Sequence, residues 1–316
     1  MKFNQLTGKQ RQDIASAGRK ATKKLSEDLG VDHRTIRKWR ARLKSTVIEA
    51  TPVKEKSPAR VLVLDIETAP MKAFIWSMWN FNLGQSLNMQ LSDWFMLTWS
   101  AKWLFEETTM SDRLTPEEVF AEDDSRITTS LWHLLEEADV VITHNGKKFD
   151  VKKINTRFLK HNIAPPMPYQ TIDTLEHIKK QFSISSNKLD YVAGFLGLGG
   201  KISTGGFELW KRCMTGDEEA LIQMETYNIG DVTLLEDVYL VIRPYVKPHP
   251  NMGLFILDNV SCCPSCGSTE LDWQGTYKTY ASVFEAFRCK HCTSVGRSRK
   301  SSIPLRSKSQ LTISVP

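Results

Sequence analysis

Four carboxylates and one tyrosine, in three short segments, constrain the fold of this chain more than any other sequence feature. Asp65 and Glu67 come directly after the apolar run 61–64, which predicts a short buried strand. Side chains two positions apart leave a strand on the same face, so these two carboxylates lie together and repel each other. A bound hard cation makes such a pair tolerable, because Mg²⁺ and Mn²⁺ prefer oxygen ligands.

The other two segments supply further ligands for the same site. Asp150 follows the strand-like run 139–143 and the turn-like 144–146, at the point where a helix opens. Tyr227 and Asp231 are four residues apart, which places both on one face of a helix, one turn apart. The carboxylates predict a pair of divalent cations ~3.5–4 Å apart, one generating the attacking hydroxide and one stabilising the leaving oxygen of a phosphodiester. Tyr227 is expected to orient the attacking water.

Alternating strand-like and helix-like runs over residues 61–250 predict an α/β domain with a central mixed sheet flanked by helices. The Trp- and Phe-rich stretch between the first two strands is expected to lie mainly in the core. The expected helices cover about residues 115–137, 150–161, 171–181, 187–196 and 217–241.

The three segments resemble the motifs of the DEDD exonucleases of the ribonuclease-H-like fold: Asp-x-Glu, an Asn…Phe-Asp segment and Tyr-x3-Asp. The tyrosine subgroup is indicated because Thr, not His, stands at position 226. The resemblance covers about 61–245 and is strongest to stand-alone domains like the proofreading part of family-B DNA polymerases. It extends to the runs 172–175 and 186–191. No polymerase-like segment follows, so proofreading in cis is not expected.

The resemblance implies 3′-to-5′ removal of nucleotides from a single-stranded end. It implies that Asp65 bridges two Mg²⁺ or Mn²⁺ ions, that Glu67 and Asp231 complete the shell of the first, and that Asp150 holds the second, partly through water. Asn145 is expected to hydrogen-bond the substrate, although its spacing to Phe149 is one residue longer than in the Asn-x2-Phe-Asp form. Lys188 is expected near substrate phosphate. A surface role for that lysine is the alternative.

Residues 1–44 predict a small helical unit. Apolar spacing at Ala21, Leu25 and Leu29 indicates a helix, Gly30 suits its left-handed end, and Asp32 suits the N-cap of a helix over about 33–44. The stretch 25–39 resembles a helix-turn-helix, whose second helix enters the major groove. The residues expected to contact DNA there are His33, Arg34, Arg37 and Lys38. Protein contacts are the alternative use of this unit.

Charge is segregated along the chain. Residues 1–60 carry a net charge of +10, residues 61–260 carry −9 and residues 261–316 carry +5. Basic ends around an acidic centre favour a protein that grips a polyanion, and DNA is the expected partner. Replication or recombination proteins are further possible partners. Residues 45–60, with two prolines and mixed charge, predict a linker.

Two Cys-x2-Cys pairs, separated by 22 residues, predict one structural four-cysteine Zn²⁺ site in a zinc ribbon over 251–300. The ligands are Cys263, Cys266, Cys289 and Cys292. Two disulfides are the alternative, which an intracellular compartment disfavours. The ribbon is expected to dock on nucleic acid or a partner protein, and the tail 301–316 is expected to be disordered.

The chain shows no apolar run of membrane-spanning length and no secretory signal at its start, so a cytoplasmic location is expected. The glycine-rich runs 197–201 and 204–206 do not follow the Walker pattern, and we expect a flexible loop near the site. The predicted function is a metal-dependent DNA exonuclease, of a compact kind that suits a phage or mobile element. Two alternatives remain: a nuclease acting on RNA or structured DNA, and a DNA-binding regulator with a degenerate nuclease core.

Overall fold

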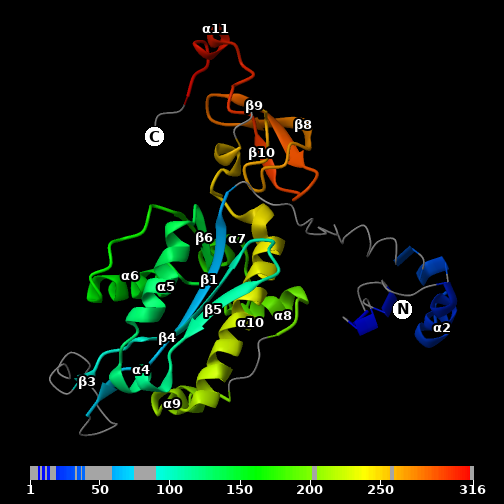
Figure 1. The fold of residues 1–316 in the computed structure, drawn as a ribbon. Helices are drawn as coiled ribbons and strands as arrows, with labels where there is room; N and C mark the ends of the chain where they lie inside the picture. The colour runs from blue at the N-terminus through cyan, green and yellow to red at the C-terminus, as the bar shows by residue number, and fades with distance from the viewer. Residues whose placement is uncertain are drawn as a thin grey trace. The chain divides into compact units, whose positions relative to one another are not determined.

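The computed structural model describes residues 6–7, 9–10, 13–14, 19–32, 34–36, 38–39, 59–74, 90–200, 205–256 and 260–313. Contacts within the chain divide it into two compact units, residues 1–51 and 52–316 (Figure 1). Each unit is described by itself.

The first unit is helical where it is described. Helix α2 spans Arg19–Leu29, and Gly30 follows it with φ +60°, as the sequence predicts for a helix end. Asp32 then receives the backbone N–H of Arg34 on its side chain at 2.6 Å, which caps the next helical segment. A small core contains the buried side chains Leu6, Ile14, Ile36 and Trp39.

The second unit contains a five-stranded mixed sheet in the order β5-β4-β1-β6-β7 (Figure 1). Strand β1 runs antiparallel to β4 and parallel to β6, and β6 runs parallel to β7. The sheet and its helices confirm the predicted α/β core with a central mixed sheet. The strands are β1 (Val61–Thr68), β4 (Met96–Trp103), β5 (Thr109–Arg113), β6 (Val140–Thr143) and β7 (Gln170–Asp173).

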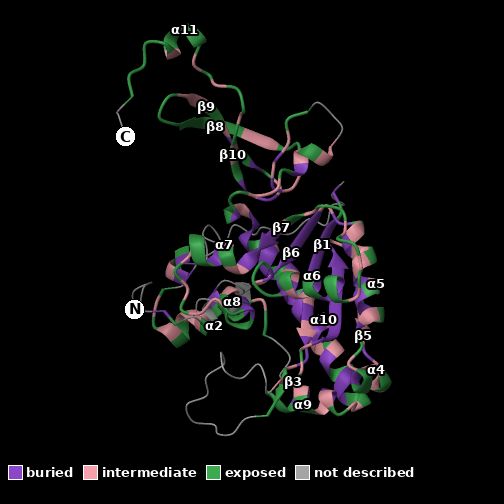
Figure 2. Cartoon of the chain, turned by 90° about the vertical axis from the view of Figure 1, so that its left-hand side faces the viewer, coloured by how far each residue is buried: buried purple, intermediate pink, exposed green. Residues whose placement is uncertain are grey.

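Helices cover both faces of this sheet, and its central strands β4, β1 and β6 are almost entirely buried (Figure 2). One face packs against α5 (Ser125–Glu136) and α6 (Asp150–Lys160). The other packs against α7 (Thr174–Gln181), α8 (Leu189–Leu196) and α10 (Glu218–Ile242). Shorter elements complete the unit: α4 (Pro116–Ala121), α9 (Glu208–Met214), the hairpin of β2 (Lys72–Ala73) and β3 (Gln90–Ser92), and the 3-10 helices η4 (Arg243–Tyr245) and η5 (Met252–Phe255). Among the described residues, no helix is both long and apolar enough to span a membrane.

Two expected helices differ from the structure. The run 115–137 is broken into α4 and α5, because Glu122 ends α4 in the left-handed conformation with φ +52°. The run 171–181 begins instead as strand β7. Asp173 then caps α7 by accepting the backbone N–H groups of Leu175 and Glu176.

The cysteine-bearing region folds as a three-stranded antiparallel sheet, in the order β10-β9-β8. Its strands are β8 (Leu271–Lys278), β9 (Val283–Cys289) and β10 (Val295–Arg297). In the tail, for which the sequence predicts disorder, the structure describes residues up to 313 with one helical turn, α11 (Leu305–Lys308).

Candidate metal centre and its cleft

Strand β1 places Asp65 and Glu67 on one side of the sheet. Burial alternates at this end of the strand: Ile66 is buried, whereas Asp65 and Glu67 are half-buried. Both carboxylates therefore share the face that also carries Val61 and Val63, the face packed against α10. The sequence predicts this shared face, but it does not show that β1 continues as a strand through both carboxylates to Thr68.

Helix α10 brings the third carboxylate to the same place. Carboxylate oxygens of Asp65, Glu67 and Asp231 lie within 4.8 Å of one another, and Asp231 is buried. Asn228, one turn before Asp231, donates its side-chain amide to Asp65 Oδ2 at 2.6 Å. Tyr227 packs against the core beside Trp210, with ring centroids 6.5 Å apart.

Asp150 lies beside this cluster because of the sheet register. The parallel pairing of β1 with β6 ends at Val63 and Ile142, and β1 then runs on past the end of β6. Asp150, the first residue of α6, accepts the backbone N–H of Ile66 on Oδ1 at 3.2 Å. Its carboxylate thus contacts the residue between Asp65 and Glu67.

Electrostatics at Asp150 suit a cation. Burial raises the pKa of Asp150 to about 7, and the Asp173 carboxylate adds to this, while the hydrogen bonds from its own backbone and from Ile66 oppose it. A buried carboxylate beside three others is stabilised in its charged form by a bound cation. The donor set is all oxygen, as Mg²⁺ and Mn²⁺ require. Asp65, Glu67, Asp150 and Asp231 therefore fit a divalent-metal centre.

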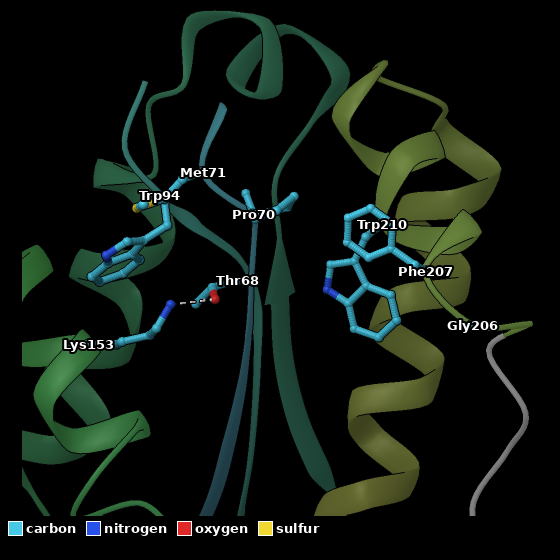
Figure 3. A pocket seen from close by; sticks show the side chains of 9 residues that line it. Thr68, Pro70, Met71, Trp94, Lys153, Gly206, Phe207 and Trp210 are labelled. Carbon is cyan, nitrogen blue, oxygen red and sulfur yellow. Dashed lines mark hydrogen bonds between the residues drawn. The ribbon is translucent and has the colours of Figure 1, made fainter. Parts of the chain in front are cut away.

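An apolar pocket opens next to the carboxylates, at the end of β1. Figure 3 shows Trp94 and Lys153 on one side of it and Phe207 and Trp210 on the other, with Pro70 between them. Gly206 and Phe207, at the start of α9, come from the region where the sequence predicts a loop near the site. Flat aromatic walls of this kind suit a planar ring.

Lys153 lines the pocket and also interacts electrostatically with the carboxylates. Its ammonium donates to Thr68 Oγ1 at 2.9 Å and lies 4.0 Å from the centroid of the Trp94 ring (Figure 3). The pKa of Lys153 is lowered overall, and burial is the largest cause. Neighbouring carboxylates, among them Asp150 and Glu67, oppose this shift. This cation therefore lies within electrostatic reach of the proposed metal ligands.

The turn between β6 and α6 is held by Asp173. Its carboxylate accepts the backbone N–H groups of Asn145 at 2.9 Å and Lys147 at 3.2 Å. Asn145 has φ +74°, a conformation that asparagine tolerates better than most residues. Asn145 and Lys188, the two predicted substrate-binding residues, line one common pocket with His144.

The four cysteines meet in a second candidate metal site. Cys263 Sγ lies 3.5 Å from Cys292 Sγ, and Cys266 Sγ lies 3.6 Å from Cys289 Sγ. Four sulfurs at ~2.3 Å from a tetrahedral Zn²⁺ are about 3.8 Å from one another, so the donor set fits zinc. All six cysteines are free, which contradicts the disulfide alternative. Cys213 is buried, and burial raises its pKa to about 12, as expected of a core thiol.

A third acidic group, Asp123, Asp124 and His161, is structural. The buried Asp124 accepts from Arg157 at 2.6 Å and from the backbone N–H of Met96 at 2.7 Å, so its charge is already compensated. Of the four residues expected to contact DNA, Arg34 and Lys38 are exposed on helical segments, and His33 and Arg37 lie outside the described residues.

Comparison with known proteins gives one family match over part of the second unit. Residues 105–242 match the family model of the RNase_H superfamily, a stretch that includes Asp150, Tyr227 and Asp231 but not β1. Among solved structures, the chain is similar to a family B DNA polymerase from the hyperthermophilic archaeon Pyrobaculum calidifontis. The identity is 16%, the TM-score is 0.42, and the match covers 60% of this chain and 26% of that one. No curated protein matches the chain. Residues 105–242 of the second unit are thus similar to the RNase_H superfamily, and the mixed sheet flanked by helices is consistent with such a core.

Several residues of the site were not predicted from the sequence. Lys153 stands three positions after Asp150, so helical spacing from the motif carboxylate marks the same face. Asn228 lies inside the tyrosine segment but carries no motif signal. Trp210 lies in the short helix α9, and Phe207 is the N-cap of that helix. No periodic pattern in the sequence predicts α9, so only the tertiary structure places these two residues at the site.

Proposed function

We propose that this protein is a divalent-metal-dependent nuclease that removes nucleotides from the 3′ end of single-stranded DNA. The observation that carries the proposal is the convergence of Asp65, Glu67 and Asp231 within 4.8 Å, with Asp150 bonded to the backbone between the first two. The match of residues 105–242 to the RNase_H superfamily supports hydrolysis of nucleic acid.

The residues have distinct roles in this reaction. Asp65, Glu67, Asp150 and Asp231 would hold two Mg²⁺ or Mn²⁺ ions. When bound, these ions supply the positive charge that phosphodiester hydrolysis needs at the attacking water and at the leaving oxygen. The phenol of Tyr227, one helical turn from Asp231, hydrogen-bonds the attacking water and aligns it with the phosphorus. Asn228 fixes the orientation of the Asp65 carboxylate through its amide hydrogen bond.

The pocket beside the carboxylates receives the nucleotide to be removed. Base–aromatic stacking is worth about 1–3 kcal/mol per base and depends little on base identity, which suits a nuclease that trims any sequence. Trp94 and Trp210 offer such surfaces on opposite walls (Figure 3). A base in a duplex is already stacked and paired, so the pocket favours a frayed or single-stranded end. Lys153 then lies close enough to the carboxylates to contact a phosphate of the same nucleotide.

Digestion of a 5′-labelled single-stranded DNA oligonucleotide tests this proposal. Wild-type protein with Mn²⁺ or Mg²⁺ is expected to give a ladder that shortens from the 3′ end, and Asp65→Ala is expected to give none. A matched control is Asp237→Ala, which removes an exposed carboxylate of α10 outside the proposed ligand set. Cleavage of RNA but not DNA would move the substrate to RNA. Binding of DNA without any hydrolysis would support the regulator alternative.

A further inference from the structure

The sheet of β8, β9 and β10 carries aromatic rings and arginines together on one face. Alternation along β9 puts Phe284, Ala286 and Arg288 on the same side. Cross-strand pairing adds Tyr277 opposite Phe284, Asp272 and Val295 on either side of Arg288, and Arg297 opposite Ala286. We name this set the open sheet face: Asp272, Tyr277, Phe284, Ala286, Arg288, Val295 and Arg297.

The open sheet face is accessible to a partner. Tyr277 is 52% exposed and Val295 is 51% exposed, and both arginines are exposed. The opposite side of β9 contrasts with it, because Phe287 and Cys289 are buried there. One side of the sheet thus covers the cysteine cluster and the other is left uncovered by the described chain.

The arginines on this face are held in place without being neutralised. The guanidinium of Arg297 lies 3.8 Å from the centroid of the Phe284 ring and 5.7 Å from that of Tyr277. Arg297 also donates to the carbonyl of Ser298 at 3.0 Å, and Arg288 donates to that of Thr293 at 3.2 Å. Within the described residues, neither guanidinium has a carboxylate within ion-pair distance. Asp272 lies opposite Arg288 in the sheet, and its carboxylate accepts from the side chain of Gln274, so two arginines against one carboxylate leave the face with a net positive charge.

We infer that the open sheet face binds single-stranded nucleic acid. Arginines that are fixed but unpaired attract phosphates, and exposed rings between them can stack on bases. Only unpaired bases offer a free ring face, so this combination selects a single strand over a duplex. The surrounding charge points the same way, since residues 260–313 carry 8 Lys and Arg against 3 Asp and Glu. The inference goes beyond the proposed hydrolytic site and rests on no catalytic step.

Fluorescence anisotropy of labelled oligo-dT with the full-length, zinc-loaded protein tests this, in the absence of added Mg²⁺ and Mn²⁺. Arg288→Ala/Arg297→Ala is expected to weaken binding at least ~10-fold and to lower the slope of log affinity against log salt by about 1.4, from two lost phosphate contacts. The charge-matched control is Arg306→Ala/Lys308→Ala on α11, which is expected to change affinity little. Zinc content verifies that the variants are folded.

A second variant separates stacking from charge. Tyr277→Leu is expected to weaken binding of oligo-dT roughly 5- to 150-fold, and to leave unchanged the binding of an abasic strand of equal length. The inference is overturned if both variants bind as wild type does, or if the arginine pair has no larger effect than its control. An equal loss of affinity for blunt duplex and for single strand in the arginine variant would overturn it too. None of these outcomes depends on whether the core hydrolyses DNA.

Discussion

Single residues around the candidate metal centre act mainly through charge. The ammonium of Lys153 donates a hydrogen bond to Thr68 in the wall of the aromatic pocket, and it also interacts with the carboxylates of Asp150 and Glu67. Its ammonium also lies 4.0 Å from the centroid of the Trp94 ring and 4.7 Å from that of Phe149. A methionine can keep much of this packing while it removes the charge.

Lys153→Met is therefore expected to lower kcat/KM on single-stranded DNA by roughly 10²-fold, the size typical of losing one donor to a developing charge. Steady-state hydrolysis with Mn²⁺ measures this, and thermal unfolding is expected to change little. Lys152→Met, at the exposed neighbouring position, is the control and should retain wild-type activity. Equal rates for the two variants would remove Lys153 from the substrate site.

A half-buried histidine, His249, makes folding depend on pH. His249 Nδ1 donates to the carbonyl of Pro250 at 2.6 Å, so its Nε2 is left to accept the hydroxyl of Tyr239 at 2.8 Å. Burial lowers the pKa of His249 to about 4 from its usual 6.5. The unfolded chain therefore binds a proton at this position between pH 6.5 and 4, where the folded chain does not.

Neutral His249 contributes to the free energy of unfolding, and this contribution is fully present above pH 6.5 and is lost as the pH falls towards 4. From pH 7 to pH 5 the loss is about 2 kcal/mol. Urea unfolding at both pH values measures it, with His249→Gln as the non-titrating reference. The variant is expected to lose about 2 kcal/mol less than wild type over this interval. The same pH dependence in both proteins would mean that His249 is not protected from protonation.

At the scale of elements, the turn from β6 to α6 sets the position of Asp150. Gly146 lies in this turn, and a Cβ added there would lie 2.1 Å from Thr143 Oγ1 and 2.4 Å from Thr143 Cβ. Rotating the threonine side chain moves the oxygen but not the Cβ, so the backbone itself has to shift. Any such shift is passed directly to the first residue of α6.

Gly146→Ala is accordingly expected to cost about 1–3 kcal/mol of stability, as overpacking does in well-packed interiors, and to lower nuclease activity as well. Gly194→Ala is the matched control, because nothing lies within 4 Å of a Cβ at that position on α8. There the substitution is expected to stabilise by up to ~1 kcal/mol through helix propensity. Unchanged activity in Gly146→Ala would show that the turn is more tolerant than its geometry indicates.

The sequence predicts some of these elements well and others poorly, for physical reasons. Strands β1 and β6 were predicted because each is a short apolar run followed by a polar segment. Strand β4 was not, because all eight of its residues are buried and the alternation that marks a strand is absent. The sequence predicts the boundary between β7 and α7 wrongly because Asp173 has two roles. It is the N-cap of α7, and its carboxylate also accepts the backbone N–H of Asn145, a residue 28 positions earlier that only the fold brings close.

At the scale of the site, local spacing predicts which carboxylates belong together, but not what surrounds them. Asp65 and Glu67 share a face because of strand periodicity, and Tyr227 and Asp231 because of helix periodicity. The aromatic pocket is different, since Trp94 and Trp210 come from segments more than a hundred residues apart. Neither residue carries a motif, and their approach depends on how α9 packs beside the end of β1.

The whole molecule combines an acidic core with basic ends. The carboxylates that fit metal ions also repel a polyanion, so approach of DNA is opposed by the −9 net charge of residues 61–260. Residues 1–60, with +10, and the cysteine-bearing region, with +5, oppose this repulsion. Linking a basic binding unit to a catalytic one raises the local concentration of DNA ends without any change to the catalytic site.

Removal of residues 1–51, the compact first unit, tests this division of labour. On long single-stranded DNA the truncated protein is expected to show a KM raised roughly 10-fold or more, because avidity is lost, whereas kcat stays near that of the full chain. Its affinity is also expected to depend less steeply on salt, since fewer phosphates are contacted. A dinucleotide substrate is the control: it is too short to engage both units, so its kcat/KM should be the same for both proteins. If KM on long DNA were also unchanged, the first unit would not tether DNA. If truncation left the trimming of RNA and of DNA equally unaffected, the alternative of an RNA substrate would gain support.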